Sequence, residues 1–157
     1  MRKTKTGSSR RKGDEYQDLT ALQFSLESYT ANSDFELFIE YEKAGSLDDV
    51  CIISPSKVTA LQVKHSVNDN DVYTIEDFTD EDSPVYLKKF ADSWSKIAAD
   101  FPDKEIELRL RSNRSINADI ASMLDSTGCF DSKFRENRYY KANRELRTAL
   151  FKASGLS

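Results

Sequence analysis

Two short stretches of this 157-residue chain combine residue types that could hydrolyse a phosphodiester. Asp48 and Asp49 precede an apolar run at 50–53, and further on Gln62 and Lys64 stand two residues apart. Such hydrolysis needs a carboxylate to hold Mg²⁺, which polarises the phosphoryl oxygen, and a lysine to stabilise the anionic transition state. One preorganised charge of this kind contributes roughly 10²–10³ in rate. The two stretches are therefore candidates for a metal-dependent hydrolytic site.

The pattern around these residues predicts a β-hairpin. Runs 50–53 and 58–63 are short and rich in β-branched residues, and the segment 54–57 between them has turn composition. Alternate residues of a strand share a face, so we expect Gln62 and Lys64 to project together. An acid at the start of the first strand would then lie beside them.

Each of these residues also has a structural interpretation. Asp48 and Asp49 could form only a turn before a strand, but the Gln-x-Lys neighbour favours a catalytic acid, and Asp49 is preferred because it adjoins the apolar run. Lys64 could instead protect an edge strand against aggregation. Alternation points His65 to the opposite face, which favours a structural or surface role, and Cys51 is predicted to be a small core residue.

Periodicity predicts the elements that must position the hairpin. A helix is expected from about residue 15, because three leucines and a tyrosine recur on one helical face: Leu19, Leu22, Leu26 and Tyr29. The other expected elements are strands at 35–41 and 106–111, a helix entered at Pro84 and running to 100, helices at 116–124 and 134–153, and a loop at 66–83 with a brief ordered piece at 72–75. The order predicts an α/β fold with a mixed sheet and helices on its faces.

The combined motifs resemble the PD-(D/E)xK, or restriction-endonuclease-like, nuclease superfamily. In that superfamily an acid and an (Asp/Glu)-x-Lys motif lie across a hairpin, and Asp49 with Gln62 and Lys64 resembles the variant in which glutamine replaces the second acid. The stretch 13–17, GDEYQ, resembles the Gly-x-x-aromatic-(Glu/Gln) start of the first helix in Mrr-like restriction endonucleases, whose last residue points into the active site. The resemblance implies that Gln17 joins the site.

With an acid at Glu40 or Glu42 and the stretch Gln-x-Lys-His, the set most resembles the N-terminal nuclease domain of bacterial antiphage effectors, including the CBASS double-stranded DNA endonucleases. Those nucleases are fused to a nucleotide-sensing or NTPase module. The resemblance covers residues 13–65 by motif and 84–152 by element order. It implies a restriction-endonuclease-like mixed central sheet flanked by helices, a double-stranded DNA substrate, Mg²⁺ as cofactor with Mn²⁺ able to substitute, and a homo-oligomer when active.

The resemblance also implies that Asp49, Glu40 and Gln62 hold the metal ion. Glu40 and Glu42 share a strand face, so alternation does not separate them, and Glu40 is slightly preferred. The departure from the family pattern is Gln62, because a neutral amide oxygen is a weaker Mg²⁺ ligand than a carboxylate. We therefore expect the metal to bind loosely until a substrate phosphate completes its coordination. Gln17 could also be an ordinary polar residue on a helix face.

The net charge of −4 conceals an asymmetric distribution. Residues 1–12 hold six basic groups and no acid, residues 133–152 hold seven against two acids, and the remainder holds 10 basic against 25 acidic groups. Two basic ends enclose an acidic body, so the average does not exclude a nucleic-acid ligand. We expect both ends to contact DNA phosphates, although the first could be only unstructured and the second only a solvated face. The residues assigned to DNA contact are Arg10, Arg11, Lys12, Arg135, Arg138 and Lys141.

Length predicts one domain, with residues 1–13 as a basic flexible arm and residues 14–153 as the nuclease domain. No window approaches 18 apolar residues, so no membrane span is expected. Cys51 and Cys129 are far apart and no secretion signal precedes them, which indicates reduced thiols in a cytoplasmic protein. Nothing at 154–157 resembles a natural end, so we expect a longer protein with a sensor or NTPase module beyond residue 157.

The sequence therefore predicts a metal-dependent endonuclease of double-stranded DNA, serving as an effector in antiphage defence. Asp49 would bind Mg²⁺ with help from Glu40 and the Gln62 amide. Lys64 would stabilise the pentacovalent phosphate and position the attacking water, while Gln17 would orient the site. Two alternatives stay open, namely a catalytically inactive module that keeps the fold for DNA or protein binding, and an RNA nuclease.

Overall fold

A computed structural model of the chain describes residues 6–31, 34–68, 70–122 and 124. The chain divides into two compact units, one comprising Met1–Asp69 and Asp92–Asn113 and the other Asn70–Ala91 and Arg114–Ser157. The residues proposed for the hydrolytic centre all lie in the first unit. The architecture of that unit therefore decides their geometry.

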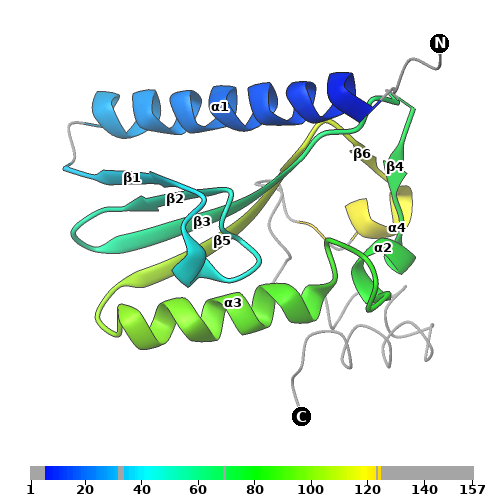
Figure 1. The fold of residues 1–157 in the computed structure, drawn as a ribbon. Coiled ribbons are helices and arrows are strands. Elements are labelled where there is room, and N and C mark those ends of the chain that lie inside the picture. Colours follow the sequence, from blue (N-terminus) through cyan, green and yellow to red (C-terminus); the bar gives the residue numbers. More distant parts are fainter. Residues whose placement is uncertain (1–5, 32–33, 69, 123, 125–157) are drawn as a thin grey trace. The chain divides into compact units, whose positions relative to one another are not determined.

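Four strands form the central sheet of the first unit (Figure 1). They are β1 Glu36–Ile39, β2 Val50–Ile53, β3 Lys57–Lys64 and β5 Glu105–Ser112. β1, β2 and β3 pair antiparallel, whereas β3 and β5 pair parallel. The sheet is therefore mixed, which confirms the predicted α/β class, and the expected hairpin is the β2–β3 pair.

Helix α1, Thr6–Thr30, covers one face of this sheet (Figure 1). Ala21 and Phe24 of α1 pack against alternate residues of the hairpin. Those hairpin residues are Val50, Ile52, Leu61 and Val63. Because successive strand residues alternate between faces, Gln62 and Lys64 lie on the face that α1 does not cover.

The start of α1 corrects the predicted flexible arm. The helix begins at Thr6 and not near residue 15, so residues 6–13 are helical, while residues 1–5 lie outside the described part of the chain. The two arginines and the lysine at 10–12 are good helix formers next to an already nucleated helix, whereas the poorer formers glycine and serine at 7–9 explain why composition predicted an arm. None of the described helices, α1 included, is both long and apolar enough to cross a membrane.

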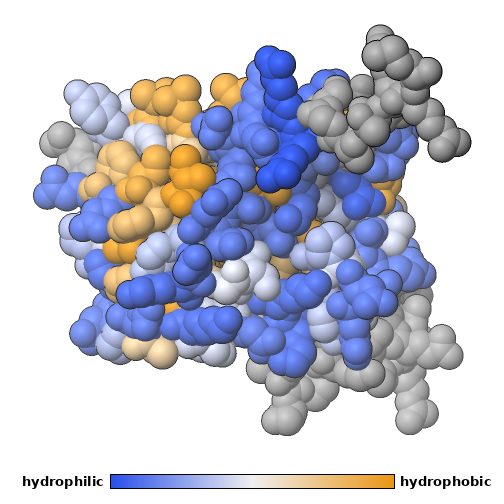
Figure 2. All heavy atoms as spheres, in the orientation of Figure 1, coloured by the Kyte–Doolittle hydropathy of each residue, from blue (hydrophilic) through white to orange (hydrophobic). Residues whose placement is uncertain are grey.

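The leucine face that predicted α1 is not the face that packs. Its residues Leu19, Leu22, Leu26 and Tyr29 are between 54% and 77% exposed. Figure 2 shows hydrophobic side chains gathered over α1 and β1. The packing face instead combines the small Ala21 with Phe24. The periodicity therefore identified the helix but not its buried side.

Helix α3, Leu87–Asp100, begins beyond Pro84, which lies in a turn and not in the first helical turn as predicted. From Asp92 onward α3 belongs to the first unit and lies on the sheet face away from α1 (Figure 1). Ser93 and Ile97 are its buried residues, each 1% exposed. Helices of this unit thus lie on both faces of the sheet.

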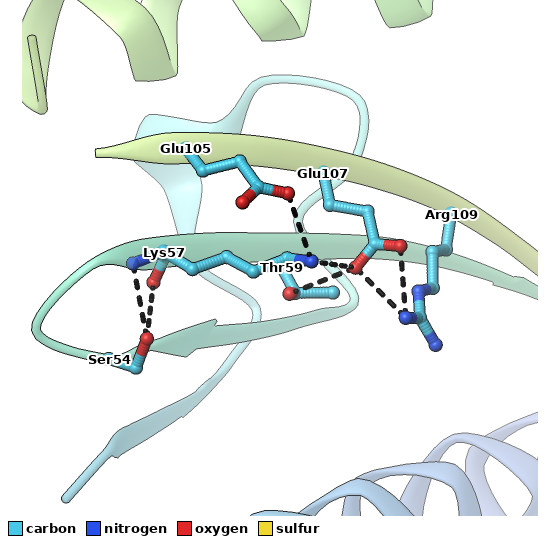
Figure 3. Close-up of polar contacts among 6 residues, drawn as sticks. All are labelled: Ser54, Lys57, Thr59, Glu105, Glu107 and Arg109. Carbon is cyan, nitrogen blue, oxygen red and sulfur yellow. Dashed lines mark hydrogen bonds and ion pairs between the residues drawn. The ribbon is translucent and has the colours of Figure 1, made fainter. Parts of the chain in front are cut away.

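A cluster of charged side chains, here called the ion-pair cluster, connects β3 with β5. Figure 3 shows Lys57 of β3 reaching toward Glu105 and Glu107 of β5, at 3.2 and 3.1 Å. Arg109 forms a second ion pair with Glu107 at 2.9 Å, and the Thr59 hydroxyl donates to Glu107 at 3.4 Å. The hydrogen bond to Glu107 raises the pKa of Lys57. Burial acts to raise the pKa of Glu107, but hydrogen bonds from Arg109 and Lys57 outweigh it and lower that pKa.

The second unit contains short elements. They are β4 Val72–Tyr73, α2 Ile75–Thr79, β6 Ser115–Ile116 and α4 Ala118–Ala121, with β4 parallel to β6. The guanidinium of Arg114 stacks 3.9 Å from the Tyr73 ring centroid and forms an ion pair with Asp77 at 3.5 Å. The ordered piece predicted at 72–75 is confirmed, but the predicted loop around it also contains α2. A capping box marks the start of α2, in which the Thr74 N–H donates to Asp77 at 2.8 Å.

The C-terminal predictions have mixed outcomes. Among the described residues of the helix predicted at 116–124, Ala118–Ala121 are helical and the others are not. The basic helix predicted at 134–153 lies outside the described residues, as do Arg135, Arg138, Lys141 and Cys129.

Candidate active site

Asp49 lies where β2 and β3 stop pairing. The last paired residues are Val50 and Leu61, and the chain bends at Asp49. The Asp49 carboxylate accepts the main-chain N–H of Val63 through Oδ2 at 2.6 Å. The side chain thus serves as the next hydrogen-bond partner of β3, in place of a main-chain carbonyl. This contact fixes one carboxylate oxygen between the two strands.

Lys64 and Gln62 approach Asp49 from the neighbouring strand, as the hairpin predicted. Lys64 Nζ lies 3.8 Å from Asp49 Oδ2, and the two side chains keep 33% and 23% of their surface exposed. Because Val50 pairs with Leu61, the next positions, Asp49 and Gln62, stand opposite each other. The Asp49 carboxylate and the Lys64 ammonium therefore meet at one partly open end of the hairpin, with Gln62 at the strand position opposite Asp49.

Gln17 reaches this place from α1. Its side-chain N–H donates to the main-chain carbonyl of Asp49 at 2.9 Å. The contact is with the backbone and not with the carboxylate, so Gln17 restrains the conformation of Asp49. The predicted neighbourhood of Gln17 and Asp49 is therefore present, in the form of a backbone contact.

Glu40 follows the last residue of β1 and stands opposite Asp49. Its N–H donates to the Asp49 carbonyl at 3.3 Å, and its φ of +56° is in the left-handed region that favours glycine. Glu42 lies further along, in the exposed 3₁₀ turn η1 (Glu42–Ala44). The backbone thus brings Glu40 next to Asp49. Among the described residues, no three His, Cys, Asp or Glu side chains are grouped so as to hold a metal ion.

Gln62 is the buried member of the site, with 6% of its surface exposed. Its side-chain N–H donates to the Ser46 carbonyl at 3.0 Å, while Oε1 is buried and has no hydrogen-bond partner among the described residues. An unpaired buried acceptor costs about 1–3 kcal/mol. Sequence reasoning missed Ser46, because Gly45 and Ser46 signalled only a turn.

Two residues near the site, His65 and Cys51, have structural roles. The His65 ring packs against Tyr16 of α1, with ring centroids 5.5 Å apart, so it lies on the α1 side, as alternation predicted. Cys51 is fully buried, and burial raises the pKa of its thiol to about 11. A protonated, buried thiol is a poor nucleophile and ligand, which agrees with the predicted core role.

The three predicted DNA-contacting residues that the structure describes are Arg10, Arg11 and Lys12. All three are exposed on α1, upstream of Gln17 on the same helix. A rigid helix, and not a flexible arm, therefore presents these cations.

Comparison with known protein families gives a match over nearly the whole chain. A family model described as the double-stranded DNA endonuclease domain of Cap4 matches residues 5–153. No curated protein and no solved structure matches the chain significantly. The matched segment includes every residue of the candidate site and nearly the whole chain, so the chain belongs to the Cap4 double-stranded DNA endonuclease domain family.

Proposed function

We propose that this chain is a metal-dependent endonuclease that hydrolyses double-stranded DNA as the effector domain of an antiphage defence protein. Membership of the Cap4 endonuclease domain family supports the reaction and the substrate. The observation that carries the assignment to residues is the Asp49–Lys64 ion pair at the end of the hairpin, with Gln62, whose Oε1 is buried and unpaired among the described residues, at the strand position opposite Asp49.

The donor set fits a hard divalent cation. Mg²⁺ prefers oxygen ligands, and the site offers the Asp49 carboxylate together with the buried, unpaired Oε1 of Gln62. Glu40 is the further acid whose backbone stands opposite Asp49. These three residues would hold Mg²⁺, or Mn²⁺ in its place. The bound ion would polarise a phosphoryl oxygen as a Lewis acid.

The chain's own groups have separate tasks. The Lys64 ammonium would neutralise the charge that develops on the phosphate while a bond forms from the water oxygen to phosphorus and the bond to the leaving oxygen breaks. Its ion pair with Asp49 holds it at the site before substrate arrives. Gln17 acts as a positioning residue, because it binds the Asp49 carbonyl.

Plasmid cleavage with Mg²⁺ tests the assignment. Asp49→Asn removes the charge but keeps an oxygen that accepts the Val63 N–H, so we expect the fold to persist and the rate to fall about 10²–10³-fold. Lys64→Met keeps the aliphatic stem and should lower the rate by a similar factor. Asp48→Asn is the matched control and should cleave like the wild type.

Three results would contradict the proposal at different points. Undiminished cleavage by both Asp49→Asn and Lys64→Met would refute the assigned site. Cleavage that continues in EDTA would refute the metal dependence. Faster digestion of RNA or single-stranded DNA than of duplex DNA, compared side by side, would refute the substrate.

A further inference from the structure

Gln62 is held by a turn that is itself held by α3. The turn follows η1 and contains Gly45 and Ser46. The Ser46 carbonyl accepts the Gln62 side-chain N–H at 3.0 Å, and the Ser46 N–H donates to the Ser93 hydroxyl oxygen at 3.0 Å. Ser46 therefore connects a buried residue of α3 with a buried residue of β3.

The turn packs tightly against α3 at this point. Gly45 has a φ of +69°, and a Cβ placed there would lie 3.0 Å from the Ser93 Oγ. Ser93 is 1% exposed, and the neighbouring anchors Ala44 and Leu47 are fully buried. The position of the Ser46 carbonyl is therefore set by packing on both sides and by the hydrogen bond to Ser93.

This carbonyl decides which way the Gln62 amide faces. A carbonyl oxygen only accepts hydrogen bonds, so the amide nitrogen must face Ser46 and Oε1 must face away from it. Oε1 is the atom left buried without a partner among the described residues. A carboxylate in place of the amide could not donate to Ser46, which gives a physical reason for glutamine at this position.

We propose that Ser93 is a positioning residue for the metal site, acting through Ser46 to hold the Gln62 amide with its oxygen toward the ligand position. The inference rests on the proposed function, because it assumes that Gln62 Oε1 is a metal ligand. Ser93 itself touches neither metal nor substrate. Its hydroxyl fixes the turn, the turn fixes the amide, and the amide presents its oxygen.

Nuclear magnetic resonance of the Gln62 side-chain amide tests this in the whole chain without DNA. In the wild type, the amide proton bonded to Ser46 should resonate downfield of its partner, and Mn²⁺ should broaden the pair. In Ser93→Ala, the chemical shifts of the two Gln62 amide protons should converge. The Mn²⁺ concentration that half-broadens them should rise about tenfold, which is the effect of losing one hydrogen bond. Gly45→Ala places a methyl group against Ser93 at the same contact, displaces the turn from α3, and should change both readouts in the same direction.

Ser95→Ala, an exposed position on α3, is the matched control and should reproduce the wild-type spectrum. Unchanged Gln62 shifts in both Ser93→Ala and Gly45→Ala would overturn the positioning role. Mn²⁺ that fails to broaden Gln62 in the wild type would overturn the proposed ligand instead. The amide shifts alone would then still report whether Ser93 orients the side chain, so the two failures are distinguishable.

Discussion

At the scale of single residues, the site combines structural and chemical demands on the same atoms. One oxygen of Asp49 completes the hydrogen bonding of β3, and the Asp49 carbonyl accepts hydrogen bonds from both Gln17 and Glu40. To make this hydrogen bond, Glu40 adopts an unfavourable backbone conformation with a positive φ. Strained residues that are not glycine concentrate at functional sites, where the surrounding structure maintains them. Glu40 is therefore where stability and function should oppose each other.

Glu40→Gly and Glu40→Gln separate these two demands. Glycine adopts a φ of +56° without strain, so Glu40→Gly should raise the free energy of unfolding by about 1 kcal/mol, whereas Glu40→Gln should leave it nearly unchanged. Both substitutions remove the carboxylate and should slow plasmid cleavage. Denaturant unfolding and initial cleavage rates measure the two effects, and full activity in both variants would exclude Glu40 as a ligand.

Gln62→Glu tests the requirement for an amide. The carboxylate would face the Ser46 carbonyl as a second acceptor in a buried place, so we expect a loss of about 1–3 kcal/mol in the free energy of unfolding in EDTA. Mg²⁺ should restore part of this loss, since a cation stabilises the buried charge. Gln62→Met removes the same hydrogen bond without adding charge and is the control. Equal stability of Gln62→Glu and the wild type in EDTA would contradict the explanation.

At the scale of elements, different forces hold the two ends of strand β3. Near its end, Leu61 and Val63 pack in an apolar cluster with Phe24 of α1, whereas the start of the parallel β3–β5 pair is connected by the ion-pair cluster. Phe24→Ala should cost about 3–4 kcal/mol of unfolding free energy, because Phe24 is buried. Leu26→Ala, on the exposed face of the same helix, is the control and should cost under about 1 kcal/mol of unfolding free energy. If the two substitutions lowered the free energy of unfolding equally, the leucine face would be covered in solution.

The ion-pair cluster predicts a specific dependence on pH. Its ion pairs lower the pKa of Glu107 in the folded chain below the ordinary value of 4.5. The unfolded chain therefore binds the proton first as the pH falls, and the stabilisation, present above pH 4.5, is lost as the pH drops through the folded pKa. Glu107→Gln should lower the free energy of unfolding by about 0.5–1 kcal/mol at pH 7 and flatten its decrease in acid. Glu105→Gln, the more exposed partner, should change it less.

At the scale of the whole molecule, the net charge of −4 is misleading for a DNA nuclease. The acids are concentrated in the middle of the sequence, where most of the candidate site lies, while the first part of α1 carries Arg10, Arg11 and Lys12, all exposed. Such a division allows cations to meet the DNA backbone while carboxylates are reserved for the metal ion. Binding to DNA should therefore depend strongly on salt despite the acidic average.

Single substitutions measure this dependence. For each of Arg10→Ala, Arg11→Ala and Lys12→Ala, the slope of log binding constant against log salt concentration should become shallower by about 0.9 if that cation contacts a phosphate. Arg109→Ala is the control, because its guanidinium is already paired with Glu107. Binding measured with Ca²⁺ in place of Mg²⁺ avoids cleavage. Slopes that do not change in any α1 variant would place the DNA contact elsewhere.

The amino-acid sequence was sufficient to predict the hairpin, the α/β class, the juxtaposition of Asp49 with Lys64 and the family. Those features depend on local alternation and on short spacing, which hold wherever the hairpin folds. The three-dimensional structure was needed to show which face of α1 is buried, that residues 6–13 are helical, and that Ser46 is hydrogen-bonded to both Gln62 and Ser93. The contacts among these join residues that are at least 16 positions apart, and no local pattern specifies which of several apolar or polar side chains will meet across such separations.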